Sequence, residues 1–147
     1  MQIEPCTLLD DKTLDELINV WEKSVRSSHF FLTEKDIAFY KPLIRNQYLQ
    51  AVRLFVIRDE NQKINAFLGL SDEMIEMLFV DPIAQRKGLG SILIDFAYEK
   101  ENIKFVDVNE DNKKALSFYL KKGYKIISRD AFDNQGKPFP ILHLKKG

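Results

Sequence analysis

Apolar residues recur along this chain with two different periods, and the alternation between these periods outlines its secondary structure. Near the start they fall three or four positions apart, which predicts an amphipathic helix over residues 11–26. A second helical spacing follows over residues 37–44, after a Thr33 and Asp36 pair that resembles a capping signal. Pro42 favours a break in this second helix. We expect the two helices to cover one edge of a sheet, with residues 27–32 as the loop between them.

Short runs of β-branched and aromatic residues predict the strands. They cover residues 2–9, 53–57, 64–70, 73–80, 104–108, 124–128 and 139–144. Two further helices are expected at residues 88–100 and 109–122, with Gly123 as a left-handed residue after the second. Residues 73–80 and 104–108 should form a parallel pair, joined by a right-handed crossover through the intervening helix. The sequence therefore predicts an α/β fold, a mixed sheet of about six to seven strands with helices on both faces.

Composition narrows the class of protein. The 147 residues predict a single domain over residues 1–147, and the 45% hydrophobic and 30% charged content is ordinary for a globular protein. A net charge of zero gives no support to nucleic-acid binding, and no apolar run approaches the roughly 20 residues of a membrane span. The single cysteine, Cys6, and a start without a basic and then apolar segment lead us to expect a cytoplasmic protein.

Residues 75–96 carry the clearest chemistry. They read as a buried strand, a turn at Asp81-Pro82, a loop with Gly88 and Gly90, and an amphipathic helix. The first amides of a helix have no intrahelical acceptor and sit at the positive end of the helix dipole, so this arrangement suits a phosphate. Arg86 and Lys87 add positive charge beside it.

Two common phosphate motifs fit this stretch poorly. The dinucleotide fingerprint needs a third glycine where this chain has Leu93, although Asp107 lies near the position of its acidic residue. The nucleoside-triphosphate loop needs Gly-Lys-Ser/Thr, whereas Gly90 is followed by Ser91 and Ile92. A dinucleotide oxidoreductase is disfavoured but stays open as an alternative.

The hexapeptide Gln85-Arg86-Lys87-Gly88-Leu89-Gly90 resembles the acyl-CoA pyrophosphate loop of the GCN5-related N-acetyltransferases (GNAT). A second motif of that family, Asn-x-x-Ala-x-x-Phe-Tyr-x-x-x-Gly-Phe/Tyr, is similar to residues 112–124. Its matching positions are Asn112, Ala115, Phe118, Tyr119, Gly123 and Tyr124. The resemblance covers roughly residues 73–127, and the ends of the chain look like a small bacterial single-domain branch.

The resemblance implies acetyl-CoA as cofactor. It places the backbone amides from Arg86 to Ser91 on the pyrophosphate, the backbone of Phe79 and Val80 on the pantetheine arm, and Asn112 (or Asn109) on the arm or the loop. The cofactor-binding set is then Phe79, Val80, Gln85, Arg86, Lys87, Gly88, Leu89, Gly90, Ser91 and Asn112. No metal is expected, because two histidines and one cysteine far apart in sequence give no ligand spacing.

Two residues are candidates for proton transfer. Tyr119 lies four positions after Ala115, so both residues share one helix face. The small Ala115 leaves room for a ligand, and the phenol of Tyr119 can point at its thiol. The resemblance makes Tyr119 the general acid. Glu76 lies among apolar residues on both faces of its strand, so partial desolvation should raise its pKa and suit it to act as general base, directly or through water. Each residue also has a purely structural explanation. Tyr119 fits a core tyrosine, and Glu76 fits a carboxylate that is paired or that is exposed where two strands splay apart. For substrate contacts we name His29, which packing or surface exposure also explains, and Glu73.

These observations predict an N-acetyltransferase that transfers the acetyl group of acetyl-CoA directly, in a ternary complex, to a primary amine. The acceptor is a protein lysine, a protein N-terminus or a small amine, and a homodimer is common among such proteins. The alternative is a non-catalytic acyl-CoA-binding sensor. The pairing of Tyr119 with Glu76 favours the enzyme, because a sensor needs neither.

Overall fold

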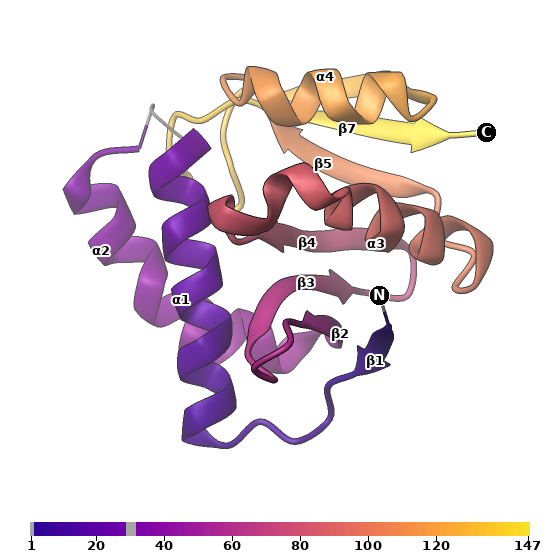
Figure 1. The fold of residues 1–147 in the computed structure, drawn as a ribbon. Coiled ribbons are helices and arrows are strands. Elements are labelled where there is room, and N and C mark those ends of the chain that lie inside the picture. The colour runs from indigo at the N-terminus through magenta and orange to yellow at the C-terminus, as the bar shows by residue number, and fades with distance from the viewer. Residues whose placement is uncertain (1, 29–31) are drawn as a thin grey trace.

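A seven-stranded mixed sheet forms the centre of the molecule (Figure 1). The computed structural model describes residues 2–28 and 32–147. The strands are β1 (Ile3–Pro5), β2 (Arg53–Arg58), β3 (Ile64–Leu70), β4 (Met74–Val80), β5 (Phe105–Asn109), β6 (Tyr124–Asp130) and β7 (Ile141–Lys146). Their order is β1-β2-β3-β4-β5-β7-β6, and only β4 and β5 are parallel among these strands. The predicted fold class, the β2–β3 hairpin and the parallel pair are confirmed.

Helices cover both faces of this sheet (Figure 1). They are α1 (Asp11–Ser28), α2 (Glu34–Leu43), α3 (Leu89–Glu99) and α4 (Lys113–Lys121), with a π-helical turn Ile44–Tyr48 and the 3-10 turns Leu49–Ala51 and Pro82–Lys87. The chain stays helical through Pro42, so the expected break is wrong; the helix instead widens into the π-helical turn. Within the described residues, no helix is long and apolar enough to cross a membrane.

Two hydrophobic cores lie on opposite sides of the sheet. Leu89, Leu93 and Ile94 of α3 pack with α4 and one sheet face, and all three are almost fully buried. Leu17 and Trp21 of α1 pack with Phe67 on the other face. Because both faces are covered, β3 is apolar at every position except Asn65, as expected for a central strand.

The parallel strands β4 and β5 pair over a short distance only. Their register holds Met74 opposite Phe105 and Ile75 opposite Val106, and it extends no further. Beyond Ile75 the two strands diverge, so the remainder of β4 has no ladder with β5. A gap therefore opens in the middle of the sheet at the carboxyl ends of the parallel pair, where open α/β sheets commonly bind ligands.

A β-bulge in β4 falls at Glu76. Ile75 pairs with Leu70 and Met77 with Gly69, so Glu76 is the extra residue in this strand. As a result Ile75 joins the core that holds Leu78 and Val80, while Met77 joins the core on the opposite face. The regular alternation expected from the sequence does not hold here, and the bulge turns Glu76 outward.

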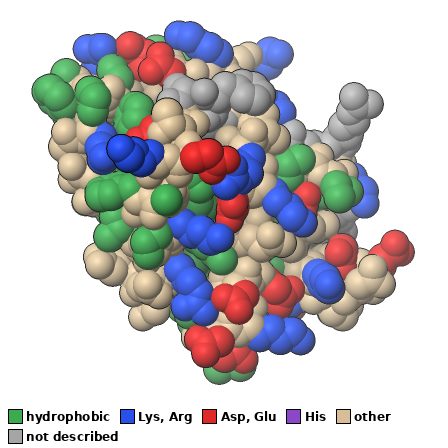
Figure 2. Space-filling view, turned by 90° about the vertical axis from the view of Figure 1, so that its left-hand side faces the viewer, with side chains coloured by type: hydrophobic (Ala, Val, Ile, Leu, Met, Phe, Trp, Pro, Cys, Tyr) green, Lys and Arg blue, Asp and Glu red, His purple; other side chains and the backbone are tan. Residues whose placement is uncertain are grey.

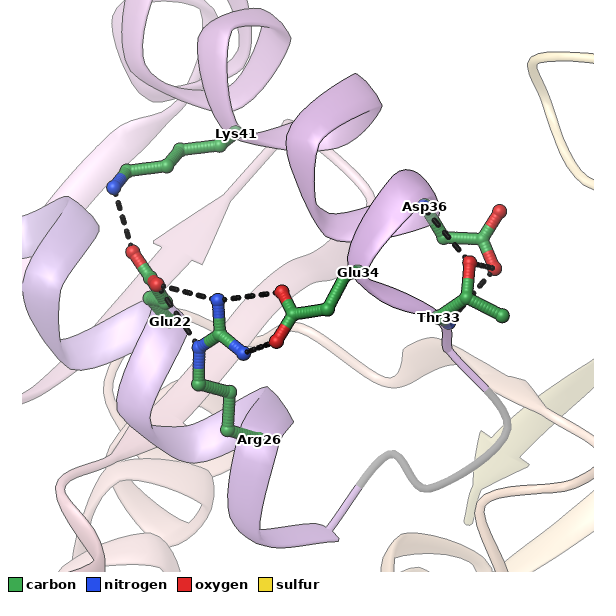
Figure 3. A network of polar contacts seen from close by, with 6 residues as sticks. All are labelled: Glu22, Arg26, Thr33, Glu34, Asp36 and Lys41. Atoms are coloured by element: carbon green, nitrogen blue, oxygen red, sulfur yellow. Dashed lines mark hydrogen bonds and ion pairs between the residues drawn. The ribbon is translucent and has the colours of Figure 1, made fainter.

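The α1–α2 hairpin is fixed by polar contacts around its loop (Figure 3). Arg26 of α1 binds both carboxylate oxygens of Glu34, at 2.5 and 3.0 Å. Glu22 bonds Arg26 one turn away and also meets Lys41 at 2.6 Å. Thr33 and Asp36 form the capping box that the sequence predicts for α2. This network holds α2 against α1.

The connection between β6 and β7 leans on α2 and its π-helical turn. Tyr40 donates a hydrogen bond to Asp133, and Gln135 donates one to the hydroxyl of Tyr48. The ammonium of Lys137 sits 4.4 Å from the ring centre of an α2 phenylalanine. Two segments about 90 residues apart in sequence are thus joined over the open end of the sheet gap.

Candidate active site

Three cavities with shared walls run through the gap between β4 and β5. The loop cavity, about 340 Å³, lies beside the start of α3. The gap cavity, about 110 Å³, lies between the diverging strands, and the tyrosine cavity, about 220 Å³, lies under the β6–β7 connection. Tyr119 lines the first two and Glu76 lines the last two. A ligand reaching through the gap would therefore meet both predicted catalytic residues.

The loop cavity ends at the N-terminus of α3. Gly88 precedes the helix in the left-handed conformation (φ 72°), and no side chain in the described part of the chain caps the helix there. The first amide bonded back to this turn is that of Ile92, which donates to the Gly88 carbonyl at 3.1 Å. The amides of Leu89, Gly90 and Ser91 precede it, at the positive end of the helix dipole. This end of the cavity is suited to hold an anion such as a pyrophosphate.

The other predicted loop residues have different surroundings. Leu89 is fully buried in the core, so only its backbone can serve a ligand. Lys87 lines a surface groove beside α1 and not the loop cavity. The side chains of Gln85 and Arg86 and the whole of His29 lie outside the described parts of the structure.

That surface groove carries charges of both signs. It runs between α1, the β2–β3 turn and the Pro82–Lys87 turn. Figure 2 shows Lys and Arg side chains interspersed with Asp and Glu on this side of the molecule. The opposite charges lie close together, as in the Lys23–Asp81 pair at 3.8 Å, so the groove favours neither an anion nor a cation.

The middle of the loop cavity is lined by strand and helix residues that the sequence singled out. Phe79 and Val80 supply the β4 side, beyond the last residue of β4 that pairs with β5. Asn112 is buried, accepts a hydrogen bond from the Ala115 amide at 3.1 Å and so caps α4. It lines both the loop and the gap cavities. Asn109 instead accepts a bond from the Asp111 amide at 2.9 Å in the turn before α4.

Tyr119 is 6% exposed and projects from α4 to the cavities. Its ring packs edge-on against Phe118 and Tyr124, with centroids 5.2 and 5.4 Å away. Burial, followed by the neighbouring Tyr124, raises the pKa of the Tyr119 hydroxyl above its ordinary value. The phenol therefore keeps its proton at neutral pH and is available as a donor.

Glu76 is exposed and lies where β4 and β5 diverge, which is the position that its structural alternative describes. The bulge in β4 moves it out of the apolar rows and onto the wall shared by the gap and tyrosine cavities. Its pKa is nevertheless raised, first by partial desolvation and then by the carboxylate of Asp107; a hydrogen bond from Ser71 opposes this. A carboxyl group with a raised pKa beside a cavity is suited to accept a proton.

The tyrosine cavity holds most of the residues that sequence reasoning missed. Tyr40, Tyr48, Asp107, Asp133 and Gln135 line it together with Glu76. Among these residues, only Asp107 stands out in the sequence near its own position, because it is a charged residue between the buried Val106 and Val108. Glu73 is exposed in the turn before β4 and is absent from the walls of all three cavities.

A family model described as "Acetyltransferase (GNAT) domain" matches residues 50–126, which contain both sequence motifs and the strands β4 and β5 that border the gap. The chain belongs to this family. It is an N-acetyltransferase that uses acetyl-CoA, as the sequence predicts. The cavities agree with this cofactor. Along them lie, in order, the N-terminus of α3, the part of β4 beyond its ladder with β5, and the buried phenol of Tyr119.

Similar proteins include the peptidyl-lysine N-acetyltransferase YjaB of Escherichia coli (strain K12). It is 33% identical over 130 residues, which cover 88% of each chain. The solution structure of apo-form YjaB has a TM-score of 0.87 at 31% identity, over 99% of this acetyltransferase and 97% of that chain. PaiA N-acetyltransferase from Thermoplasma acidophilum, solved in complex with coenzyme A, has a TM-score of 0.72 at 19% identity over 100% of both chains and supports the fold alone.

Proposed function

We propose that this acetyltransferase modifies a primary amine, with the side chain of a protein lysine as the acceptor, in a direct transfer within a ternary complex. The observation that carries the proposal is that Tyr119 and Glu76 line neighbouring cavities with shared walls in the sheet gap, and both line the gap cavity. The names of YjaB and of the more distant YiaC, which is 23% identical over 114 residues, support lysine as the acceptor class.

The cofactor would enter from the α3 side. The amides of Leu89, Gly90 and Ser91 would bind the pyrophosphate, and the stretch of β4 around Phe79 and Val80, beyond its ladder with β5, would lie beside the pantetheine arm. Holding the thioester in the gap beside the amine lowers the entropic part of the barrier.

The acceptor would enter from the tyrosine cavity. A lysine side chain suits this cavity because its apolar stem can lie against the rings of Tyr40 and Tyr48 while its ammonium meets Glu76 and Asp107. Asp133 has a different role: it accepts bonds from Tyr40 and from the backbone amides of Gln135 and Lys137, and so it shapes the β6–β7 connection.

The proton balance follows from these positions. Glu76, directly or through a water molecule, removes a proton from the acceptor ammonium, and the neutral nitrogen attacks the thioester carbon. The carbon–sulfur bond breaks, and Tyr119 protonates the departing sulfur. The second proton of the nitrogen restores the Tyr119 hydroxyl, and Glu76 releases the first proton to solution, so that amide, thiol and one proton in solution are the products.

Acetyl-CoA consumption with a panel of acceptors tests the proposal. The panel contains a lysine peptide with a blocked N-terminus, a peptide whose only free amine is its α-amino group, and spermidine. We expect thiol release to be fastest with the lysine peptide and Glu76→Gln to reduce it at least tenfold at neutral pH. Faster turnover of spermidine or of the α-amino peptide would exclude lysine as the preferred acceptor. Thiol release with none of the three, despite saturable acetyl-CoA binding, would favour the sensor alternative.

A further inference from the structure

His143 lies between two carboxylates on the face of the sheet opposite α3 and α4. Its Nδ1 is 2.6 Å from Asp107 Oδ1, and its Nε2 is 2.7 Å from Asp130 Oδ2. The three side chains come from β5, β7 and β6, three neighbouring strands. Both ring nitrogens face oxygen acceptors, so the doubly protonated ring satisfies both contacts.

A bulge in β6 selects these partners. The register passes from Ile126 opposite Leu144 to Ser128 opposite His143, which leaves Ile127 as the extra residue. A regular ladder would have placed Ile127 opposite His143 and Arg129 diagonal to it on the same face. The bulge moves the following residues by one position, so Asp130 reaches the histidine ring and Arg129 pairs with Glu110 at 2.6 Å.

Asp107 connects this cluster to the active site. It lies directly opposite His143 in the β5–β7 ladder. It also lines the gap and tyrosine cavities together with Glu76, and its charge acts on the Glu76 carboxyl group. One oxygen of Asp107 is held by the ring of His143, which fixes how the carboxylate is presented to the cavities.

We propose that His143 is a positioning residue for acetyl transfer: anchored by Asp130, its charged ring holds Asp107 at the cavity wall, and this pair sets the charge that Glu76 experiences. The proposal rests on the proposed function in taking Glu76 as the base. It adds a residue outside the cavities, which acts on the acceptor through Asp107 and Glu76.

The sign of the effect can be worked out from the groups around Glu76. Asp107 faces it from β5, Tyr40 and Tyr48 from the α2 side, Asp133 from the β6–β7 connection and Tyr119 from α4. The carboxylate of Asp130, opposed by desolvation and helped by Asp107, raises the pKa of His143 above its ordinary value of 6.5, which favours the positive ring between the two carboxylates. Removing this positive charge should raise the pKa of Glu76, and removing the negative charge of Asp107 should lower it.

Carbon-13 NMR titration of the Glu76 carboxyl group, assigned with Glu76→Gln, measures this directly. We expect His143→Gln to raise the titration midpoint and Asp107→Asn to lower it, each by on the order of half a pH unit because solvent in the cavities screens the charges. The acid limb of kcat/KM for the lysine peptide should move in the same two directions, while KM for acetyl-CoA stays within twofold of wild type. Arg129→Gln is the matched control, since it removes a positive charge from β6 on a residue paired with Glu110.

Opposite shifts in the two variants, with Arg129→Gln unchanged, support the proposal. An unchanged midpoint in His143→Gln, a shift in the same direction as Asp107→Asn, or an equal shift in Arg129→Gln would overturn it. Full turnover in Glu76→Gln is a separate result: it removes Glu76 as the base, while the NMR titrations still report whether His143 and Asp107 control its charge.

Discussion

Tyr119 and Tyr124 allow the catalytic role of one phenol to be separated from the structural role of another. Their rings pack edge-on with centroids 5.4 Å apart, and the two residues are 6% and 2% exposed. Tyr119 lines the loop and gap cavities, whereas the hydroxyl of Tyr124 is buried without a hydrogen-bond partner among the described residues. Replacing each by phenylalanine removes one oxygen atom and keeps the ring packing.

The two substitutions should have opposite profiles. Tyr119→Phe removes the proposed general acid, so we expect kcat to fall about 100-fold, or about 2.7 kcal/mol in the barrier, with KM for acetyl-CoA near wild type. Its free energy of unfolding should stay within about 0.5 kcal/mol, because the structure gives its hydroxyl no hydrogen bond within the described part of the chain. Tyr124→Phe removes a buried unpaired hydroxyl, so it should stabilise the fold by about 1 kcal/mol and leave turnover unchanged.

Thiol release measured with a chromogenic disulfide gives kcat, and chemical denaturation gives the free energy of unfolding. The stability gain in Tyr124→Phe should appear as a rise of about 3 °C in Tm for a chain of this size. If Tyr119→Phe kept wild-type kcat, Tyr119 would be only a core residue. If both variants lost turnover equally, the shared ring cluster and not the Tyr119 hydroxyl would be responsible.

Three further predictions follow from the site and from its supporting helices. In wild type, kcat/KM should rise with pH through the raised pKa of Glu76, above the ordinary 4.5, because the base must be deprotonated; Glu76→Gln should abolish this limb in a pH–rate profile. Ser91→Asp should raise Tm slightly, because a negative charge in the first turn of α3 interacts favourably with the helix dipole. The same substitution should weaken acetyl-CoA binding, measured by calorimetry, at least tenfold. Ser91→Ala should change neither Tm nor binding. Asp10→Ala removes the 2.9 Å bond from the Thr13 amide at the start of α1, so it should lower the free energy of unfolding in chemical denaturation without changing KM.

The sequence alone determined the features that depend on local spacing. The two periods of apolar residues predicted the helices, the hairpin and the parallel pair, because a residue's face is fixed by the 3.6-residue or 2-residue repeat of its own element. The phosphate-binding end was also readable, since a glycine before a helix leaves the first-turn amides available wherever that helix lies. Tyr119 was found because its motif, residues 112–124, is one continuous segment built around α4.

Only the tertiary structure decided what faces the acceptor. The bulges at Glu76 and Ile127 depend on the partner strand, and each changes the face of a charged residue that simple alternation would place elsewhere. The tyrosine cavity combines residues from α2, β4, β5 and the β6–β7 connection, and no spacing along the chain signals that they meet. The cofactor end of this acetyltransferase is therefore built mainly from residues 78–119 and is visible in sequence, whereas the acceptor end is built from contacts between distant segments and depends on how the strands pair.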